Sequence, residues 1–393
     1  MNKKLIAVAV ASIAATPLSA LAQATSSVNL YGNITMEYAF TSIPGRVSSD
    51  QSDVPGGSAI GFRGEEKLGG GLSAWFQCET SADVRGVDQV GFCSRNSAIG
   101  FKGGFGNIYH GRWDTPFKRA LNVGTVGATE TGALGASFLA FGGSGGADAN
   151  GGTTARPNEQ AAADQTSNSR ARWKRRETSI TNFDSNSFGG LTLHAGITDG
   201  KGGIDQASGT TGAKPRTMSF AGIYSAGPLQ AAVAYEIHKN FAGQGGFEGD
   251  DTAVGLAVSY TVGNLKVGAT MLDAEYETSA TGTTKKKTYT IGSSYKLSGP
   301  HSIEGQYAVA GDTKGNGAAV QGTSRQGVKA PGADTGGNQI SLWYVNQLSS
   351  RTTARVGYTR INNDLNAGYA LGNNASTVGK DQKAYGLHVS HRF

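Results

Sequence analysis

Apolar and polar residues alternate along much of the chain with a period of two, not the 3.6 of a helix. The same alternation recurs at 191–198, 229–238, 288–297 and 385–393. Each segment predicts a strand of about ten residues with one apolar and one polar face. In the first such segment the apolar face carries Val28, Leu30, Gly32, Ile34, Met36, Tyr38 and Phe40.

The connections between these segments alternate between short and long. Short, mostly Gly-bearing turns fall at 68–71, 103–106, 186–190, 226–228, 262–264, 298–300 and 348–350. Long polar loops fall at 41–57, 81–93, 113–170, 199–215, 239–251, 277–286, 313–337 and 363–381. Seven turns and eight loops join sixteen strands.

This arrangement predicts an all-β protein, a 16-stranded antiparallel transmembrane β-barrel, because an even number of strands with short turns at one end is typical of outer-membrane barrels. Lipid cannot satisfy backbone hydrogen bonds, so a sheet that spans a bilayer must close on itself. A secreted β-sandwich or lectin is the alternative. It would bury its apolar face and would lack the asymmetry between the two ends.

Composition agrees with the barrel and excludes other classes. Of 393 residues 60 are glycine, 16% are charged, and no run approaches the roughly 18 apolar residues of a membrane helix. The net charge of +6 is small and scattered, so nucleic acid is not an expected partner. No phosphate-binding or hydrolase motif is found in a suitable context, and the histidines lack ligand spacing. We therefore expect no enzyme activity, no cofactor and no metal site.

The first 22 residues have the pattern of a secretory signal peptide. Lys3 and Lys4 precede an apolar stretch at 5–15, and Ala20-Leu21-Ala22 fits a cleavage site. We expect residues 1–22 to be the signal peptide and 23–393 to form a single barrel domain.

The two cysteines, Cys78 and Cys93, would be exported to an oxidising compartment. A disulfide between them would close a loop of about 15 residues and contribute roughly 3 kcal/mol on the chain-entropy model. Two free thiols are the alternative.

A barrel of sixteen strands is too wide for wall side chains to fill its lumen. The loop at 113–170 is the longest, and its apolar piece at 133–141 is unusual for a solvated loop. We expect this third extracellular loop to fold inward and narrow the lumen, with a surface loop as the alternative.

Several segments resemble the trimeric general porins of Gram-negative outer membranes, in their betaproteobacterial and neisserial branch. They are SVNLYG at 27–32, EEKLGGGLSA at 65–74, RNSAIGFKGGFGNIYHGR at 95–112, RRETSITNFD at 175–184 and the terminal HRF at 391–393. The resemblance implies a homotrimer in outer-membrane lipid and lipopolysaccharide, with passive diffusion of small hydrophilic, often anionic solutes. It also implies that the C-terminal Phe393 serves as an assembly signal.

Basic side chains in a narrow channel concentrate anions. The candidates for selectivity are Arg63, Arg95, Arg112, Arg175 and Arg176 on the wall, and Lys118 and Arg119 at the start of the long loop. Asp114 and Glu130 are expected to oppose them across the constriction. Alternation places Arg63 inward, but it places Arg95 and Arg112 on the lipid face unless the chain bends there.

Three alternatives remain open. The barrel could be a substrate-specific channel for a small anionic metabolite. The basic cluster at 170–176 could form an electrostatic funnel or contact lipopolysaccharide, and Lys285-Lys286-Lys287 is expected to be solvated or to face lipopolysaccharide.

Overall fold

The computed structural model describes residues 27–42, 44, 49–53, 58–85, 91–127, 134–135, 173–199, 216–242, 248–320, 328–371 and 377–393. The expected signal peptide at 1–22 and Glu130 lie outside these residues. So does most of the long loop beyond residue 127.

The described residues form strands and one helix. The elements are β1 (Ser27–Ser42), β2 (Ser49–Asp53), β3 (Ala59–Gly69), β4 (Leu72–Ser81), β5 (Ser97–Gly103), β6 (Gly106–Asp114), α2 (Pro116–Gly124), β7 (Arg176–Asp184), β8 (Leu191–Thr198), β9 (Arg216–Ala226), β10 (Leu229–Ala242), β11 (Glu248–Val262), β12 (Leu265–Glu277), β13 (Thr283–Lys296), β14 (His301–Ala310), β15 (Lys314–Gly315), β16 (Gly337–Gln347), β17 (Thr352–Asn363) and β18 (Gln382–Arg392).

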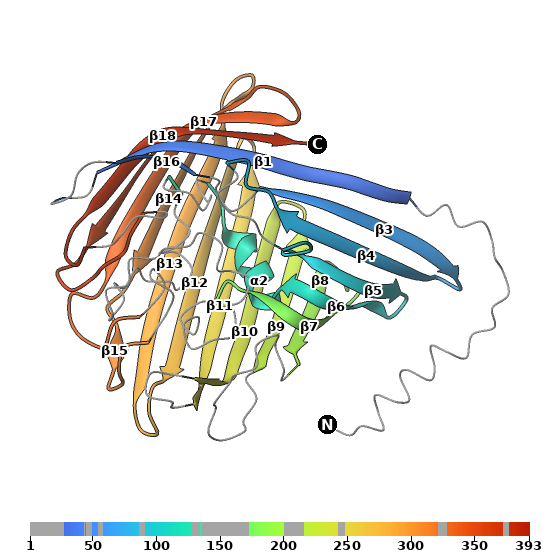
Figure 1. The fold of residues 1–393 in the computed structure, drawn as a ribbon, viewed down its shortest axis with the longest axis horizontal. Coiled ribbons are helices and arrows are strands. Elements are labelled where there is room, and N and C mark those ends of the chain that lie inside the picture. Colours follow the sequence, from blue (N-terminus) through green and yellow to red (C-terminus); the bar gives the residue numbers. More distant parts are fainter. Residues whose placement is uncertain are drawn as a thin grey trace.

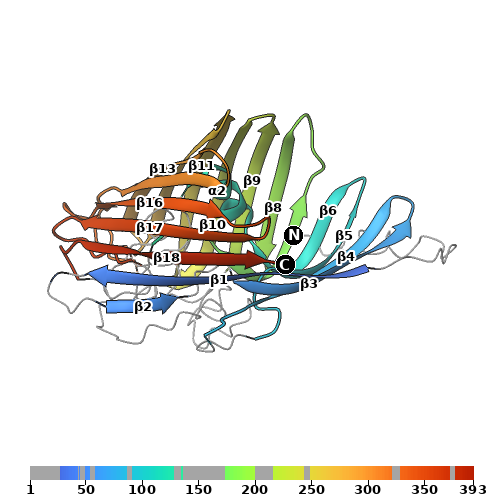
Figure 2. The ribbon, with the colours of Figure 1, turned by 90° about the horizontal axis from the view of Figure 1, so that it is seen from above.

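The strands form one antiparallel sheet that closes on itself (Figures 1 and 2). Strand β1 pairs with β3 on one side and with β18 on the other, which joins the two ends of the chain. The short strands β2 and β15 add only local pairings to β1 and β13. The remaining sixteen strands form the wall, so the predicted strand number and barrel are confirmed.

The last residue completes this closure. Beyond β18, the backbone N–H of Phe393 donates to the carbonyl of Gly32, and the carbonyl of Phe393 accepts from the N–H of Gly32, both at 3.1 Å. Gly32 leaves room for the terminal ring, because a Cβ there would lie 2.3 Å from the ring of Phe393. The assembly role of Phe393 stays a prediction. Its position is defined, since it lies where β18 pairs with β1 and closes the barrel.

All seven predicted short turns join consecutive wall strands. The apolar faces point away from the lumen and are exposed, as Val28 at 62%, Leu193 at 50% and Leu387 at 58% show. A sandwich would bury these side chains, so that alternative is wrong. Among the described residues, no helix is long and apolar enough to cross a membrane.

Helix α2 lies inside the curved wall (Figure 1). Thr115 caps its first turn by accepting a hydrogen bond from the Lys118 N–H, and Pro116 occupies the first helical position, where no backbone donor is needed. The buried face of Phe117, Ala120 and Leu121 packs on the inner side of strands β9–β12.

Beyond α2 the loop backbone lies directly on the wall. Gly268 of β12 and Gly292 of β13 are cross-strand partners, and we call this pair the glycine floor. A Cβ on Gly268 would lie 2.5 Å from the carbonyl oxygen of Gly124, and one on Gly292 would lie 1.9 Å from that of Val126. Any larger residue would therefore push the loop away from the wall.

The loop also contacts a second part of the wall, on strands β16 and β1. The Trp343 indole donates to the Leu134 carbonyl at 2.9 Å, and the Gln339 amide donates to the Gly135 carbonyl at 2.7 Å. The N–H of Leu134 donates to the Glu37 carboxylate at 3.3 Å. The described parts of the loop thus fold inward and touch two separate regions of the lumen wall.

We predict that Gly292→Val destabilises the protein by about 1–3 kcal/mol, the usual cost of overpacking, because its side chain would overlap the Val126 carbonyl. Denaturant unfolding in detergent micelles measures this change. Gly222→Val in β9 is the matched control, since a Cβ there meets only ordinary contacts from 3.7 Å. Equal stability of the two variants would contradict the prediction.

Candidate functional site

Asp114 is the centre of one charged cluster on the inner wall. It ends β6, and α2 begins two residues later, so its carboxylate lies between wall and helix. Its Oδ1 accepts from Lys118 Nζ at 2.7 Å and lies 3.1 Å from Arg176 Nε. The Asn96 amide donates to the other oxygen at 3.3 Å. One carboxylate therefore faces two cations.

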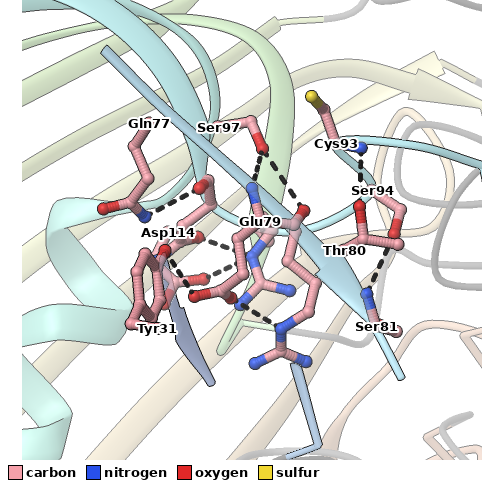
Figure 3. Close-up of polar contacts among 12 residues, drawn as sticks. Tyr31, Gln77, Glu79, Thr80, Ser81, Cys93, Ser94, Ser97 and Asp114 are labelled. Atoms are coloured by element: carbon pink, nitrogen blue, oxygen red, sulfur yellow. Dashed lines mark hydrogen bonds and ion pairs between the residues drawn. The ribbon is translucent and has the colours of Figure 1, made fainter. Parts of the chain in front are cut away.

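Glu79 of β4 is the centre of a second cluster (Figure 3). Arg95 Nε lies 2.7 Å from Glu79 Oε1, and the Tyr31 hydroxyl donates to Oε2 at 3.1 Å. The guanidinium of Arg63 lies 5.2 Å from the centre of the Tyr31 ring, a cation–π contact. Arg63 is exposed and has no carboxylate partner among the described residues.

A disulfide joins Cys78 of β4 to Cys93, two residues before Arg95. The N–H of Cys93 donates to Thr80 Oγ1 at 2.9 Å, and that of Ser81 donates to Ser94 Oγ at 3.3 Å (Figure 3). The N–H of Arg95 donates to the Glu79 carbonyl at 2.8 Å. The disulfide is confirmed, the free-thiol alternative is wrong, and residues 93–95 are held beside β4.

A third cluster joins α2 to the end of β7. Arg119 forms two parallel hydrogen bonds to the Asp184 carboxylate, at 3.0 and 2.9 Å, a geometry that fixes orientation as well as charge. The Tyr109 hydroxyl donates a hydrogen bond to the same carboxylate at 3.2 Å, and His194 Nδ1 lies 2.8 Å from its Oδ1.

Arg175 belongs to a buried layer behind these groups. It is fully buried against the Glu177 carboxylate, which also accepts from the Thr217 hydroxyl at 2.9 Å. Next to it, Trp173 stacks on His238 with ring centres 4.1 Å apart and donates to the Tyr276 hydroxyl at 2.7 Å. Burial prevents Arg175 from meeting a solute, so it supports the wall instead of lining it.

Lys174 lies between these buried residues, just before β7. Burial, together with the nearby Lys118 ammonium, lowers the pKa of Lys174 to about 7, and the Asp114 carboxylate opposes part of this shift. Its charge therefore changes in the neutral range of pH.

The Gram-negative porin family matches residues 9–366. The chain belongs to this family. It is therefore a β-barrel porin of the outer membrane and not an enzyme.

Two relatives and one solved structure show how far this porin's similarity extends. It is 27% identical to outer membrane porin protein 32 of Delftia acidovorans over 390 residues, which is 98% of this chain and 93% of the relative. Identity to the major outer membrane protein P.IB of Neisseria gonorrhoeae is 36% over 149 residues, covering 36% of this chain and 40% of the relative. The solved anion-selective porin from Comamonas acidovorans has the same fold, with a TM-score of 0.71 at 23% identity, over 94% of this chain and 100% of the other.

The porin's wall brings most of the predicted residues together, but not all in the predicted way. Arg95 precedes β5 and so escapes the alternation that would have placed it toward lipid. Arg112 is half-buried in β6, where the pairing with β7 shifts register between Gly111 and Trp113. Asp114 lies among the basic side chains and not across from them, because β6 leads directly into α2.

Sequence reasoning missed the residues that partner the arginines. Glu79, Asp184 and Tyr31 occupy inward positions of strands, but alternation alone does not say which cation lies opposite each of them. It also missed three inward aromatic residues, Trp75, Tyr109 and Trp113. The available signal was that these rings stand on the polar, not the apolar, face of their strands.

We predict that the ratio of chloride to potassium permeability of this porin rises as the pH falls from 8 to 6. With a pKa of about 7, Lys174 changes from about one-tenth to about nine-tenths protonated over this range. Reversal potentials at each pH measure the change.

Lys174→Met is expected to flatten this pH dependence, whereas Lys287→Met should retain it, because Lys287 pairs with Asp273 on the outer surface. Identical profiles for the wild type and Lys174→Met would show that another group titrates.

Proposed function

We propose that this porin is a general diffusion pore with a preference for anions, in which the third extracellular loop forms the constriction. The observation that carries the proposal is an excess of positive charge on the inner wall. Asp114 faces both Lys118 and Arg176, and Arg63 is exposed without a carboxylate partner among the described residues.

This excess acts strongly because of where it lies. Charges that line a narrow channel with low-dielectric walls focus their field into the water they enclose. The pairs of Arg95 with Glu79 and of Arg119 with Asp184 are balanced and add little net potential. Arg63, which has no carboxylate partner among the described residues, therefore sets the sign, and it favours chloride and small carboxylates.

The relatives are consistent with this proposal. The structural neighbour from Comamonas acidovorans is named as an anion-selective porin. Because that likeness lies at 23% identity, the argument for this chain rests on its own residues.

The alternative is a substrate-specific channel for a small anionic metabolite on the same barrel. Such a channel would show saturable transport of one solute and would be blocked by it, whereas a general pore would pass many small solutes in proportion to their size and charge.

The deciding experiment is the reversal potential of the purified protein in a planar bilayer under a KCl gradient. We expect a chloride-selective potential. A cation-selective potential would overturn the preference but keep the pore, and an absence of conductance from folded protein would overturn the diffusion function.

We predict that Arg63→Gln lowers the ratio of chloride to potassium permeability by roughly two- to fivefold, the effect of one unit charge a few ångströms from the ion path in water. The change should shrink at high salt because ions screen the charge. Lys285→Gln is the control, since Lys285 pairs with Glu275 on the outer surface. An unchanged permeability ratio in Arg63→Gln would show that Arg63 does not contribute to selectivity.

We also propose a homotrimer that contacts lipopolysaccharide through its outer surface. Lys285 and Lys287 point outward and pair with Glu275 and Asp273, where lipid phosphates could compete for them. Lys286 does not join them, in contrast to the expectation for the three lysines. It is buried inward and donates to the Thr335 carbonyl at 3.2 Å. Chemical cross-linking of the protein in native outer membranes tests the trimer.

A further inference from the structure

Three aromatic rings lie together on the inward face of strands β4 and β6. The ring centres of Trp75 and Tyr109 are 5.3 Å apart, those of Tyr109 and Trp113 are 5.2 Å apart, and those of Trp75 and Trp113 are 5.8 Å apart. We call these three residues the aromatic cluster. Its members come from two strands that are not neighbours, because β5 lies between them.

The wall is shaped to accept these rings. Gly100 of β5 is the cross-strand partner of both Trp75 and Tyr109. A Cβ on Gly100 would lie 2.9 Å from the Trp75 indole nitrogen and 2.5 Å from the Tyr109 Cβ. The missing side chain lets the two aromatic residues meet across the intervening strand.

Two rings of the cluster remain partly exposed, unlike the other tryptophans. Trp173 and Trp343 are buried. Trp173 lies at the end of the long loop and donates to Tyr276 of the wall, and Trp343 of the wall donates to Leu134 of the loop. Tyr109 is buried behind Trp75 and Trp113, which are both half-buried. The Trp75 and Trp113 rings therefore do not serve only as packing for the loop, and they offer apolar surface to the lumen.

An open pocket of about 400 Å³ lies near the cluster, at the end of the strands that carries the short turns. It is lined in part by Lys102, Asn107 and Asp184. Asn107 accepts a hydrogen bond from the Trp75 indole at 2.8 Å, and Asp184 accepts one from the Tyr109 hydroxyl, so two rings of the cluster are hydrogen-bonded to residues that line the pocket.

Lys102 supplies a cation that a solute could use. Its ammonium lies 2.5 Å from the Glu65 carboxylate, but both side chains are substantially exposed, at 45% and 40%. Exposed pairs of this kind contribute little to stability. A carboxylate arriving from the lumen can therefore replace Glu65 at low cost, while the rings beside it take an apolar group.

We propose that the aromatic cluster and Lys102 together bind solutes that carry a planar aromatic ring and a carboxylate as they cross the pore. The ring of the solute stacks on Trp75 or Trp113, and its carboxylate is held by Lys102. This inference rests on the proposed function, since the solute must first enter an anion-accepting lumen.

The charge of the site selects this solute class. Aromatic platforms also bind neutral sugars, but a sugar would not use the ammonium of Lys102. An aromatic cation would meet the positive excess that Arg63, Lys118 and Arg176 create on the same wall. An aromatic anion can use both the rings and the ammonium of Lys102 once it displaces Glu65.

The test compares benzoate with cyclohexanecarboxylate, which has the same charge at pH 7 and a similar size but no π system. Single-channel currents in KCl are recorded with each acid, with acetate and with glucose. We expect benzoate to interrupt the current with an affinity roughly three- to tenfold higher than cyclohexanecarboxylate, the range that aromatic stacking adds to area burial. This comparison needs only the wild-type protein.

Variants then locate the site. Trp75→Leu and Trp113→Leu should each reduce or abolish the difference between the two acids, and Lys102→Gln should weaken both acids alike. Phe76→Leu is the matched control, since it removes the neighbouring ring from the lipid-facing side of β4, where Phe76 is 41% exposed.

The outcomes separate this inference from the proposed function. A chloride-selective pore in which benzoate and cyclohexanecarboxylate act alike would overturn the aromatic site and leave the diffusion pore intact. Interruption by glucose as strong as by benzoate would show a sugar platform instead. A difference that persists in both tryptophan variants would place the binding elsewhere.

Discussion

The constraint on which this structure depends is that backbone N–H and C=O groups find no partners in lipid. The chain satisfies it by closing the sheet, with β1 paired to both β3 and β18 and the C-terminal Phe393 bonded to Gly32. Closure at sixteen strands then creates a second requirement. A wall of that circumference encloses more space than its own side chains fill, so the lumen needs a segment that is not part of the wall.

The described parts of the loop between β6 and β7 lie inside the wall, where contacts to their backbone hold them. The glycine floor of Gly268 and Gly292 accepts the carbonyls that follow α2, while Trp343 and Gln339 bind the carbonyls of Leu134 and Gly135. Because Lys118 and Arg119 belong to α2, their positions depend on where the helix docks. The electrostatics of the lumen are thus set by apolar and backbone contacts behind the charges.

Much of the fold could be predicted from the sequence, since period-two alternation and turn chemistry are local signals. Strand number and all seven turns follow from them, whereas the disulfide follows from the presence of two cysteines in a chain that carries an export signal. The site could be predicted only in part. The inward position of Arg63 follows from alternation. Arg95 lies in the connection before β5, next to the disulfide-bonded Cys93, where alternation does not apply. Asp114 lies beside its cations because β6 leads directly into α2. Such pairings depend on how separate strands register, and a single sequence does not encode them locally.

Most charges on the inner wall are paired, and this has a functional consequence. A pore that conducts must attract an ion enough to admit it but release it again. Glu79 and Asp184 each neutralise an arginine, which holds those guanidinium groups in place and keeps them from trapping anions. In the proposed function, the exposed guanidinium of Arg63 biases the lumen toward anions without closing it to other solutes. The exposed pair of Lys102 with Glu65 is different, because breaking it costs the protein little free energy. At the proposed aromatic site, a solute carboxylate can therefore take the place of Glu65.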